Sequence, residues 1–511
     1  MKQHDAILLG TSPNALCAAI VLGRAGLSVL VLDAASHVGG PVATEAFHPG
    51  FLADTGVPSA ALDPALSEQL AITTPALRRV SFTALGERTA THREIALPPA
   101  FHDGVSLLRA AYGAPAPAVP APSEADGPVL DALLAELRGL APRSLRDPAL
   151  SAAPLSIASA ALPAAAARSM REVIRLLFLS IRDFVREAEL SHAAGLLGTI
   201  AMRSRSAGPF DEGTLFGLLH HTAIHDGLTP GAARGGLAEV PRVLADVARA
   251  ANVDVRTSVP GPLRIEVTDG VARGVRLPSG ELLAASRVLS DHDARTTFTR
   301  LVSPADLPPE FNRTVRRVRY RGNAARVHLA LDRLPTFPDL PPEALAGTLF
   351  VAADLPSIER AWDAQKRGAL PARPPVEIAI PTLLDPSLAP DGKHVLSATV
   401  QYVPTACADS ASVLRAVLDS LAPFAPDLAS LVVGSAVSLP RDIESRFGLT
   451  EGHLFGGEVT LSQSFFLRPY PGATRADQPI ENVHLCGSAS HPAGYSGLAG
   501  AILARRLLAS G

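Results

Sequence analysis

Residues 5–33, DAILLGTSPNALCAAIVLGRAGLSVLVLD, decide how the start of this chain folds. The mostly apolar residues 5–10 predict a buried strand, and the turn TSPNA leads into an apolar helix from about Pro13 to Ala25. Gly26 is a helix stop signal, and SVLVLD predicts a second strand that ends at Asp33. The stretch therefore predicts a strand, helix and strand of the Rossmann kind.

This unit has the parts that hold the ADP half of a dinucleotide. Gly10 allows a tight turn, the helix N-terminus presents N–H groups to a pyrophosphate, and Asp33 is placed to bond ribose hydroxyls. The fingerprint G-x-G-x-x-G/A is imperfect, because Ser12 replaces the second glycine. The alternative is a unit of the same shape that binds no nucleotide. The cofactor-binding residues predicted here are Gly10, Ser12, Pro13, Asn14, Ala15 and Asp33.

Residues 487–502, GSASHPAGYSGLAGAI, predict a second half-site more than 450 residues after the first. The turn at Gly39 and Gly40 is expected to bring further backbone N–H groups near the same pyrophosphate. A glycine pair is by itself more typical of an ordinary turn, but its closeness to Asp33 favours a binding role. The C-terminal cofactor-binding residues predicted here are Gly487, Ser496, Gly497 and Leu498.

Composition narrows the class of protein. A chain of 511 residues predicts two or three domains, and a net charge of −3 with 5% aromatic residues argues against a nucleic-acid partner. The three cysteines lack the spacing of a disulfide framework or a zinc site. The lack of a disulfide framework predicts a cytoplasmic protein, and we find no stretch long and apolar enough to span a membrane, which leaves only peripheral membrane contact open.

The succession of strand-like and helical stretches along the chain predicts an α/β and α+β architecture, with domains built from discontinuous segments. A Rossmann-like FAD-binding domain is expected from residues 1–75, 228–300 and 455–511. A substrate domain is expected to combine a helical part, 76–227, with a mixed-sheet part, 301–454. Within the helical part, residues 113–128 are rich in Ala and Pro and predict an extended surface loop.

Several long runs resemble the phytoene-desaturase-like FAD-dependent oxidoreductases of the flavin amine-oxidase superfamily, and among them the pyridine nucleotide-disulphide oxidoreductase domain-containing protein 2 type. The resemblance covers nearly the whole chain, and it implies FAD and removal of a hydride from a CH–CH or CH–NH bond of a largely apolar small molecule. The runs that carry it are HVGGPVATEAFHPGF (37–51), LLHH (218–221), RGGLAEV (234–240), IPTLLDPSLAPDGKHV (380–395), FGLTEGHLFGGEVTLSQSFFLRPYPG (447–472) and NVHLCGSASHP (482–492).

The departures from this family lie where the flavin is expected to bind. Similar proteins have more glycines in the C-terminal motif, where this chain has Ala489, Ala493 and Tyr495 and is one residue shorter before Gly497. A valine that contacts adenine in the family is matched by Pro262, which has no N–H to donate. FAD that is held weakly, or not at all, is therefore the alternative to an ordinary flavin site.

Flavin dehydrogenation needs few acid–base residues, because the flavin accepts the hydride. His491 and Tyr495 are the catalytic candidates in the C-terminal loop, although His491-Pro492 would equally serve to shape that loop. His221, in a cluster with His220, His225 and Asp226, is a third candidate or a packed histidine. No zinc-binding pattern such as H-E-x-x-H accompanies it, so no metal site is predicted.

The sequence thus predicts an FAD-dependent oxidoreductase of the desaturase or dehydrogenase type. The alternative is a non-redox enzyme, such as an isomerase or cyclase, or a binding protein, on a fold that has weakened or lost its flavin.

Overall fold

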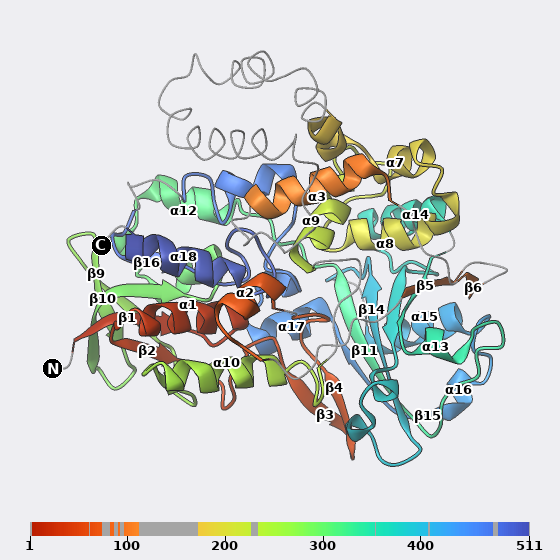
Figure 1. The fold of residues 1–511 in the computed structure, drawn as a ribbon, viewed down its shortest axis with the longest axis horizontal. Coiled ribbons are helices and arrows are strands. Elements are labelled where there is room, and N and C mark those ends of the chain that lie inside the picture. The colour runs from red at the N-terminus through yellow and green to blue at the C-terminus, as the bar shows by residue number, and fades with distance from the viewer. Residues whose placement is uncertain are drawn as a thin grey trace.

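The computed structural model describes residues 3–60, 62–73, 82–85, 90–91, 97–111, 172–225, 233–352, 354–406, 409–473 and 479–509. Two seven-stranded sheets lie side by side, and helices pack on and around them (Figure 1). The N-terminus and the C-terminus lie on the same side of the molecule, next to the first sheet. The predicted surface loop at 113–128 falls outside the described residues.

The first sheet is a parallel Rossmann-like sheet with an antiparallel hairpin added to it. The second half of β10 pairs in parallel with β1 and with β16, whereas its first half pairs antiparallel with β9. The strand order β7-β2-β1-β10 continues to β16, which confirms the predicted fold class. The strands are β1 (His4–Leu9), β2 (Val29–Leu32), β7 (Asp254–Arg256), β8 (Arg264–Thr268), β9 (Val271–Arg276), β10 (Leu282–Ser290) and β16 (Val483–Leu485).

Helix α1 (Pro13–Arg24) connects β1 to β2, as predicted, and ten of its residues are buried. It packs against α10 (Glu239–Ala250) and α18 (Leu498–Ala509), so both ends of the chain share one core. A Cβ at Gly500 would lie 1.7 Å from the carbonyl oxygen of Asn14. The small residues of the C-terminal run therefore allow α18 to approach α1 closely.

The second sheet has the strand order β15-β11-β14-β13-β12-β5-β6 and is mostly antiparallel. One face is apolar and packs on α15 (Ser410–Leu421) through residues such as Val327, Ala398 and Ile378. The strands are β5 (Phe82–Leu85), β6 (Ala90–Thr91), β11 (Ala324–Leu331), β12 (Thr348–Val351), β13 (Val376–Ala379), β14 (His394–Gln401) and β15 (Val432–Ser438).

The opposite face of this sheet carries buried polar side chains. Arg326, Thr399 and Glu377 lie in one row across β11, β14 and β13, as their strand register requires. Side chains on a strand alternate between the two faces, so the apolar and polar residues of these strands are separated with a period of two.

A helical layer lies beside the second sheet (Figure 1). The helical periodicity predicted over 170–190 forms two helices, residues 172–178 and α7 (Ile181–Glu187), because Ser180 caps the second one by accepting a hydrogen bond from the Asp183 N–H. The other helices of the layer are α3 (Pro99–Ala111), α8 (Ala194–Met202), α9 (Leu215–His225) and α14 (Leu355–Lys366).

Residues 44–54, which the sequence did not assign to strands, form the hairpin of β3 (Thr44–His48) and β4 (Phe51–Asp54). The backbone carbonyl of Asp54 accepts a hydrogen bond from Arg326, so the hairpin contacts the polar face of the second sheet. Shorter helices complete the described structure: α2 (Pro64–Gln69), α11 (Ala294–Thr296), α12 (Pro309–Arg316), α13 (Pro342–Leu345), α16 (Leu428–Leu431) and α17 (Pro440–Phe447).

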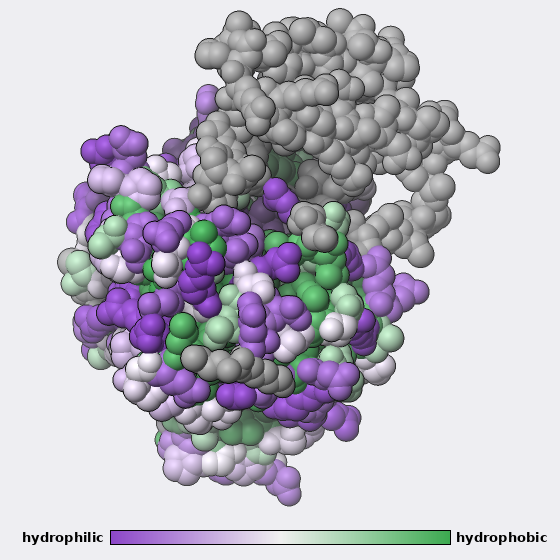
Figure 2. Space-filling model, turned by 90° about the vertical axis from the view of Figure 1, so that its left-hand side faces the viewer, coloured by the Kyte–Doolittle hydropathy of each residue, from purple (hydrophilic) through white to green (hydrophobic). Residues whose placement is uncertain are grey.

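Hydrophilic residues spread over most of the face drawn in Figure 2, with hydrophobic residues in smaller groups between them. Among the helices of the described residues, none has the length and hydropathy needed to cross a membrane.

Candidate functional site

A cavity of about 560 Å³, here called the large cavity, opens at the carboxyl ends of β1, β2 and β10. This is the edge at which parallel α/β sheets bind their ligands, and the volume lies in the usual range for a small-molecule or cofactor site. The lining comes from residues 9–12, 32–35, 37, 40–41, 45, 261–263, 291–293, 301, 320, 446–450, 453, 456, 488 and 495.

The turn between β1 and α1 forms one wall of the large cavity. Gly10 has φ of +110°, a conformation that favours glycine, and an added Cβ would lie 2.6 Å from the Cβ of Asp291. Ser12 is the N-cap of α1 but makes no side-chain capping hydrogen bond. The N–H groups of the first helical turn have no intrahelical partner, so this turn fits a pyrophosphate.

Asp33 follows β2 and lines the large cavity, as the sequence predicted for a ribose-binding carboxylate. Its two oxygens accept hydrogen bonds from the Ala35 N–H at 2.9 Å and from the Thr11 hydroxyl at 2.5 Å. Thr11 in turn accepts a hydrogen bond from the Gly39 N–H. Asp33 therefore connects β2 to the β1–α1 turn as well as facing the cavity.

Asp291 follows β10 and closes the wall beside Ser12. Its carboxylate accepts hydrogen bonds from the Ser12 N–H at 2.8 Å and from the Ser12 hydroxyl at 2.6 Å. Burial raises the pKa of Asp291, the bonds from Ser12 and the nearby His292 oppose that rise, and Asp33 adds to it. The amide that a glycine would offer to a pyrophosphate at position 12 is thus already bonded to a carboxylate.

The C-terminal loop contributes Ser488 and Tyr495 to the lining. Tyr495 is buried, and its hydroxyl makes no hydrogen bond of normal length to the described residues. Burial raises the pKa of the Tyr495 phenol, against a weaker opposing effect of Ser488, so the phenol stays protonated at neutral pH. It can donate a proton or a hydrogen bond into the cavity, but it is not a base there.

The predicted cofactor-binding residues do not all reach the large cavity. Gly10, Ser12, Asp33 and Gly40 line it, and Pro262 does as well. The cofactor-binding role of every one of these residues stays a prediction. The predicted residues outside the lining are Pro13, Asn14, Ala15, Gly39, Gly487, Ser496, Gly497 and Leu498.

Packing explains several of these positions. The Asn14 side chain donates a hydrogen bond to the Gly494 carbonyl at 2.8 Å, and the Ser496 carbonyl accepts one from the Asp63 N–H. A Cβ at Gly497 would lie 2.7 Å from the Cys17 sulfur. This part of the C-terminal motif therefore holds α18, α1 and α2 together.

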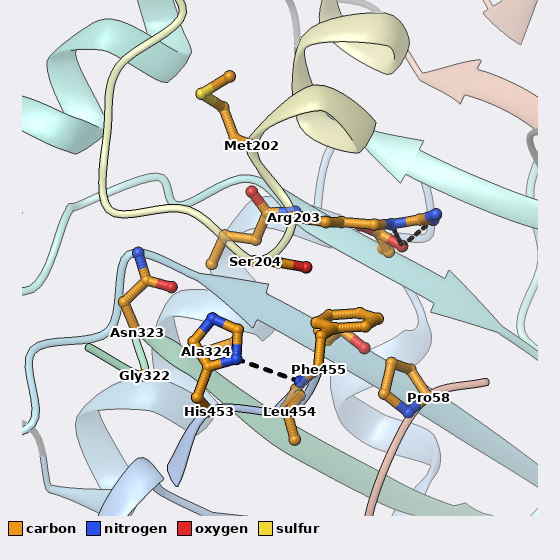
Figure 3. A pocket seen from close by; sticks show the side chains of 13 residues that line it. Pro58, Met202, Arg203, Ser204, Gly322, Asn323, Ala324, His453, Leu454 and Phe455 are labelled. Atoms are coloured by element: carbon orange, nitrogen blue, oxygen red, sulfur yellow. Dashed lines mark hydrogen bonds and ion pairs between the residues drawn. The ribbon is translucent and has the colours of Figure 1, made fainter. Parts of the chain in front are cut away.

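A second, small cavity of about 20 Å³ lies between the end of α8, the polar face of the second sheet and residues 453–455 (Figure 3). This is room for about one water molecule or a small substituent. His453 lines both cavities, so it marks the point where they adjoin. Its Nδ1 accepts hydrogen bonds from the N–H groups of Phe455 and Gly457, and burial lowers its pKa to about 3, so the ring is neutral with its proton on Nε2.

Charges in the small cavity are paired within the protein. Arg203 donates to both oxygens of Glu377, the closest contact being 2.5 Å, and both side chains are less than 10% exposed. The Gln401 amide nitrogen donates to Glu377 and to the Thr199 carbonyl, which fixes the orientation of the amide. Its oxygen is buried and without a hydrogen-bond partner among the described residues.

The histidine candidates lie in different places. His221, on α9, is buried and its Nε2 lies 3.1 Å from the hydroxyl of Ser204, which lines the small cavity. The ring of His491 lies 6.1 Å from that of Phe465 at a tilt of 43°, and His491 lines neither cavity. The structure confirms that His225 lies on the same helix as His221, whereas Asp226 falls outside the described residues.

Sequence reasoning missed several lining residues, including Asp291, Asp293, Tyr320 and His453. Asp291 ends the run RVLSD (287–291) and Asp293 comes two residues later, so their place at the carboxyl end of a parallel strand was a usable signal. The polar face of the second sheet also had a signal, because Arg326 and His328 alternate with apolar residues in β11.

Comparisons with known proteins agree with this geometry. The profile "Flavin containing amine oxidoreductase" matches residues 131–508, and "NAD(P)-binding Rossmann-like domain" matches residues 9–67. The rat pyridine nucleotide-disulfide oxidoreductase domain-containing protein 2 is 28% identical, over 96% of this chain and 91% of its own length. A zeta-carotene-forming phytoene desaturase from Myxococcus xanthus is 27% identical, over 59% of this chain and 55% of its own.

Among solved structures, putrescine oxidase bound to putrescine superposes with a TM-score of 0.58 at 18% identity, over 99% of both chains. At this identity the likeness concerns the fold.

Proposed function

The chain belongs to the flavin containing amine oxidoreductase family, and we propose that it desaturates or dehydrogenates a largely apolar small molecule at a CH–CH or CH–NH bond. FAD is the cofactor of this family, and the large cavity has the volume, the glycine turn and the ribose-facing carboxylate that such a cofactor needs. The observation that carries the proposal is that His453 lines both cavities, because a redox cofactor and its substrate must lie next to each other.

In this proposal the turn at Gly10 and Ser12, together with Asp33, holds the ADP half, and Ser488 and Tyr495 contact the part nearer the second sheet. FAD would supply the acceptor for a hydride, so the protein has to position the substrate and keep water out. Dehydrogenation takes a hydride and a proton from the substrate, and in this proposal the proton is released to solvent. The protonated phenol of Tyr495 lines the cavity and is placed to donate a hydrogen bond that positions the reacting groups.

The substrate would lie against the small cavity, between His453 and the polar face of the second sheet. The unbonded oxygen of Gln401 and the carboxylate of Glu377 make this end rich in hydrogen-bond acceptors. Arg203 balances the charge of Glu377. We therefore expect an apolar substrate with one uncharged N–H or O–H donor at the end that enters the small cavity.

The test is the visible spectrum of the purified full chain, followed by release of the chromophore from denatured protein. One FAD per chain is expected, either on purification or after addition of FAD. Anaerobic bleaching of the bound flavin then ranks candidate substrates, and an alkane that bleaches as well as the matching alcohol or amine would contradict the expected donor group.

The rival function is a non-redox enzyme, such as an isomerase or cyclase, or a binding protein on a fold that has lost its flavin. The observation that favours it is the bond between Asp291 and the Ser12 amide. Colourless protein that gains no flavin on titration would support this rival and reject the oxidoreductase.

A further inference from the structure

The large cavity is acidic for a site that takes a diphosphate. Its lining has four carboxylates, Asp33, Glu45, Asp291 and Asp293, and one guanidinium, Arg446. Glu45 and Arg446 form an ion pair with each other, so Arg446 is not free to neutralise another group. No other lysine or arginine is part of this lining.

Two of the three remaining carboxylates, Asp33 and Asp293, accept hydrogen bonds from protein groups that the pyrophosphate does not need. Asp33 bonds the Ala35 N–H and the Thr11 hydroxyl, and it faces the expected ribose, which is uncharged. Asp293 caps α11 through the Thr296 N–H and accepts a hydrogen bond from Thr450. Neither carboxylate bonds an amide that the fingerprint assigns to the pyrophosphate.

Asp291 is different, because it bonds the amide at the second glycine position of the fingerprint. Both the N–H and the hydroxyl of Ser12 donate to it. A phosphate oxygen that approached this turn would meet the half-buried carboxylate of Asp291 at the donor it needs, where charge repulsion is screened less than in open water. The contact is specified by the fold, since a Cβ at Gly10 would collide with Asp291 and a Cβ at Gly487 would lie 1.8 Å from its carbonyl oxygen.

We propose that FAD binding in the large cavity is coupled to the uptake of one proton by Asp291, which removes the carboxylate charge and makes the Ser12 amide available to the pyrophosphate. The inference rests on the proposed function only in taking FAD as the ligand. It makes Asp291 the residue that decides how tightly this chain holds its cofactor.

The groups that face Asp291 support this coupling. Asp33 comes from the end of β2, His292 from its own loop, Cys486 from the end of β16 and Tyr495 from the C-terminal loop. Only His292 can be positively charged, and burial raises the pKa of both Cys486 and Tyr495, so these two stay neutral.

The sign of the pH dependence follows from these surroundings. The pKa of Asp291 is raised by burial in the free protein, and a neighbouring diphosphate raises it further. FAD affinity should therefore increase as the pH falls through the interval between the two values, by up to tenfold per pH unit. Above this interval the carboxylate is charged in both states, so the affinity is low and independent of pH.

The experiment uses the full chain freed of flavin and titrated with FAD between about pH 5 and pH 9. The wild-type affinity should rise as the pH falls. Calorimetry in buffers with different heats of ionisation should show uptake of up to one proton for each FAD bound. The pyrophosphate of FAD is a diester and carries two charges throughout this range, so the proton is taken up by the protein.

Two variants show which residue takes up the proton when FAD binds. Asp291→Asn keeps the shape and removes the charge, so at neutral pH it should bind FAD at least tenfold more tightly than wild type, with a flat pH profile and no proton uptake. His292→Gln, the matched control, should keep a slope like that of wild type but displaced to higher pH, because the nearby His292 opposes the rise in the pKa of Asp291.

FAD binding with an affinity independent of pH and without proton uptake would overturn this inference and leave the proposed function intact. A slope that survives in Asp291→Asn but is lost in His292→Gln would also overturn it. Absence of FAD binding at every pH would overturn both.

Discussion

The large and the small cavity adjoin at His453, yet their buried charges have different kinds of partner. In the small cavity, Arg203 and Glu377 neutralise each other and Gln401 bonds the same carboxylate. In the large cavity, the carboxylate of Asp291 accepts hydrogen bonds from the amide and the hydroxyl of Ser12, and it pairs with no lysine or arginine among the described residues. Removing a charge from water is costly when no counter-charge accompanies it, and binding a proton removes that cost. The comparison indicates that the charges of the small cavity are balanced before a substrate enters, whereas the charge of Asp291 in the large cavity is not.

The largest effect on stability is expected when the buried ion pair of the small cavity is broken. Glu377→Gln leaves Arg203 buried with no counter-charge, which should lower the free energy of unfolding by about 3–5 kcal/mol. Urea denaturation measures this loss. The double variant Arg203→Met with Glu377→Leu should recover much of it, because neither charge is then left alone.

The matched control is Arg333→Gln, which removes the exposed partner of Asp427. It should leave the denaturation midpoint unchanged, because exposed ion pairs contribute little. A midpoint shift for Glu377→Gln no larger than that of the control would show that the small cavity does not depend on its ion pair.

Next in size is the loss of Asp33 from the large cavity. Asp33→Ala should weaken FAD binding by about 1–3 kcal/mol, the usual cost of losing hydrogen bonds to a charged acceptor. FAD titration with the fold checked by circular dichroism measures this change. Thr11→Val separates the two roles of Asp33, since it removes the link to the turn and keeps the carboxylate facing the ribose. Equal affinities of Asp33→Ala and wild type would reduce Asp33 to a residue at the end of a strand.

A smaller effect in the opposite direction is expected at Ser12. Ser12→Gly removes the hydroxyl that stabilises the charged form of Asp291, and it lets the backbone approach the pyrophosphate. FAD should bind more tightly by about 1 kcal/mol, which is one net hydrogen bond. Fluorescence titration at neutral pH checks this, and an unchanged affinity would indicate that the turn has been given over to another ligand.

The smallest effect on stability is expected for Tyr495→Phe. The hydroxyl makes no normal hydrogen bond to the described residues, so the free energy of unfolding should stay within about 0.5 kcal/mol of wild type. FAD content should also stay intact. Turnover of an accepted substrate should fall by about 10²-fold if the phenol positions the reacting groups through a hydrogen bond. Unchanged turnover would leave Tyr495 as a packing residue beside Val42 and Leu237.

Much of the fold was predictable because its signals are local. The sequences Thr268-Asp269-Gly270 and Pro278-Ser279-Gly280 are local hairpin signals that join β8, β9 and β10, and Asp269 and Gly270 both have the positive φ that a tight hairpin turn needs. The hairpin at 44–54 was missed, since β3 is mostly half-buried and the sequence of β4, FLAD, does not alternate apolar with polar residues. Of the residues that line the large cavity, the sequence singled out the β1–α1 turn, Asp33, Gly40 and Tyr495, where residue type and spacing are the signal.

The sequence by itself determined the parallel β1–α1–β2 unit, the return of the chain to it in β16 and α18, and the place of Asp33 at the end of β2. These depend on hydrophobic period and on turn residues, which act over a few positions of the chain. Tertiary structure alone decided that Asp291 meets Ser12 across 279 residues of sequence and that Arg203 meets Glu377 across 174. The first contact depends on β1 and β10 becoming neighbours in register, and the second depends on the end of α8 packing against the polar face of β13. Register is set by the packing of whole faces, so no short stretch of sequence contains it.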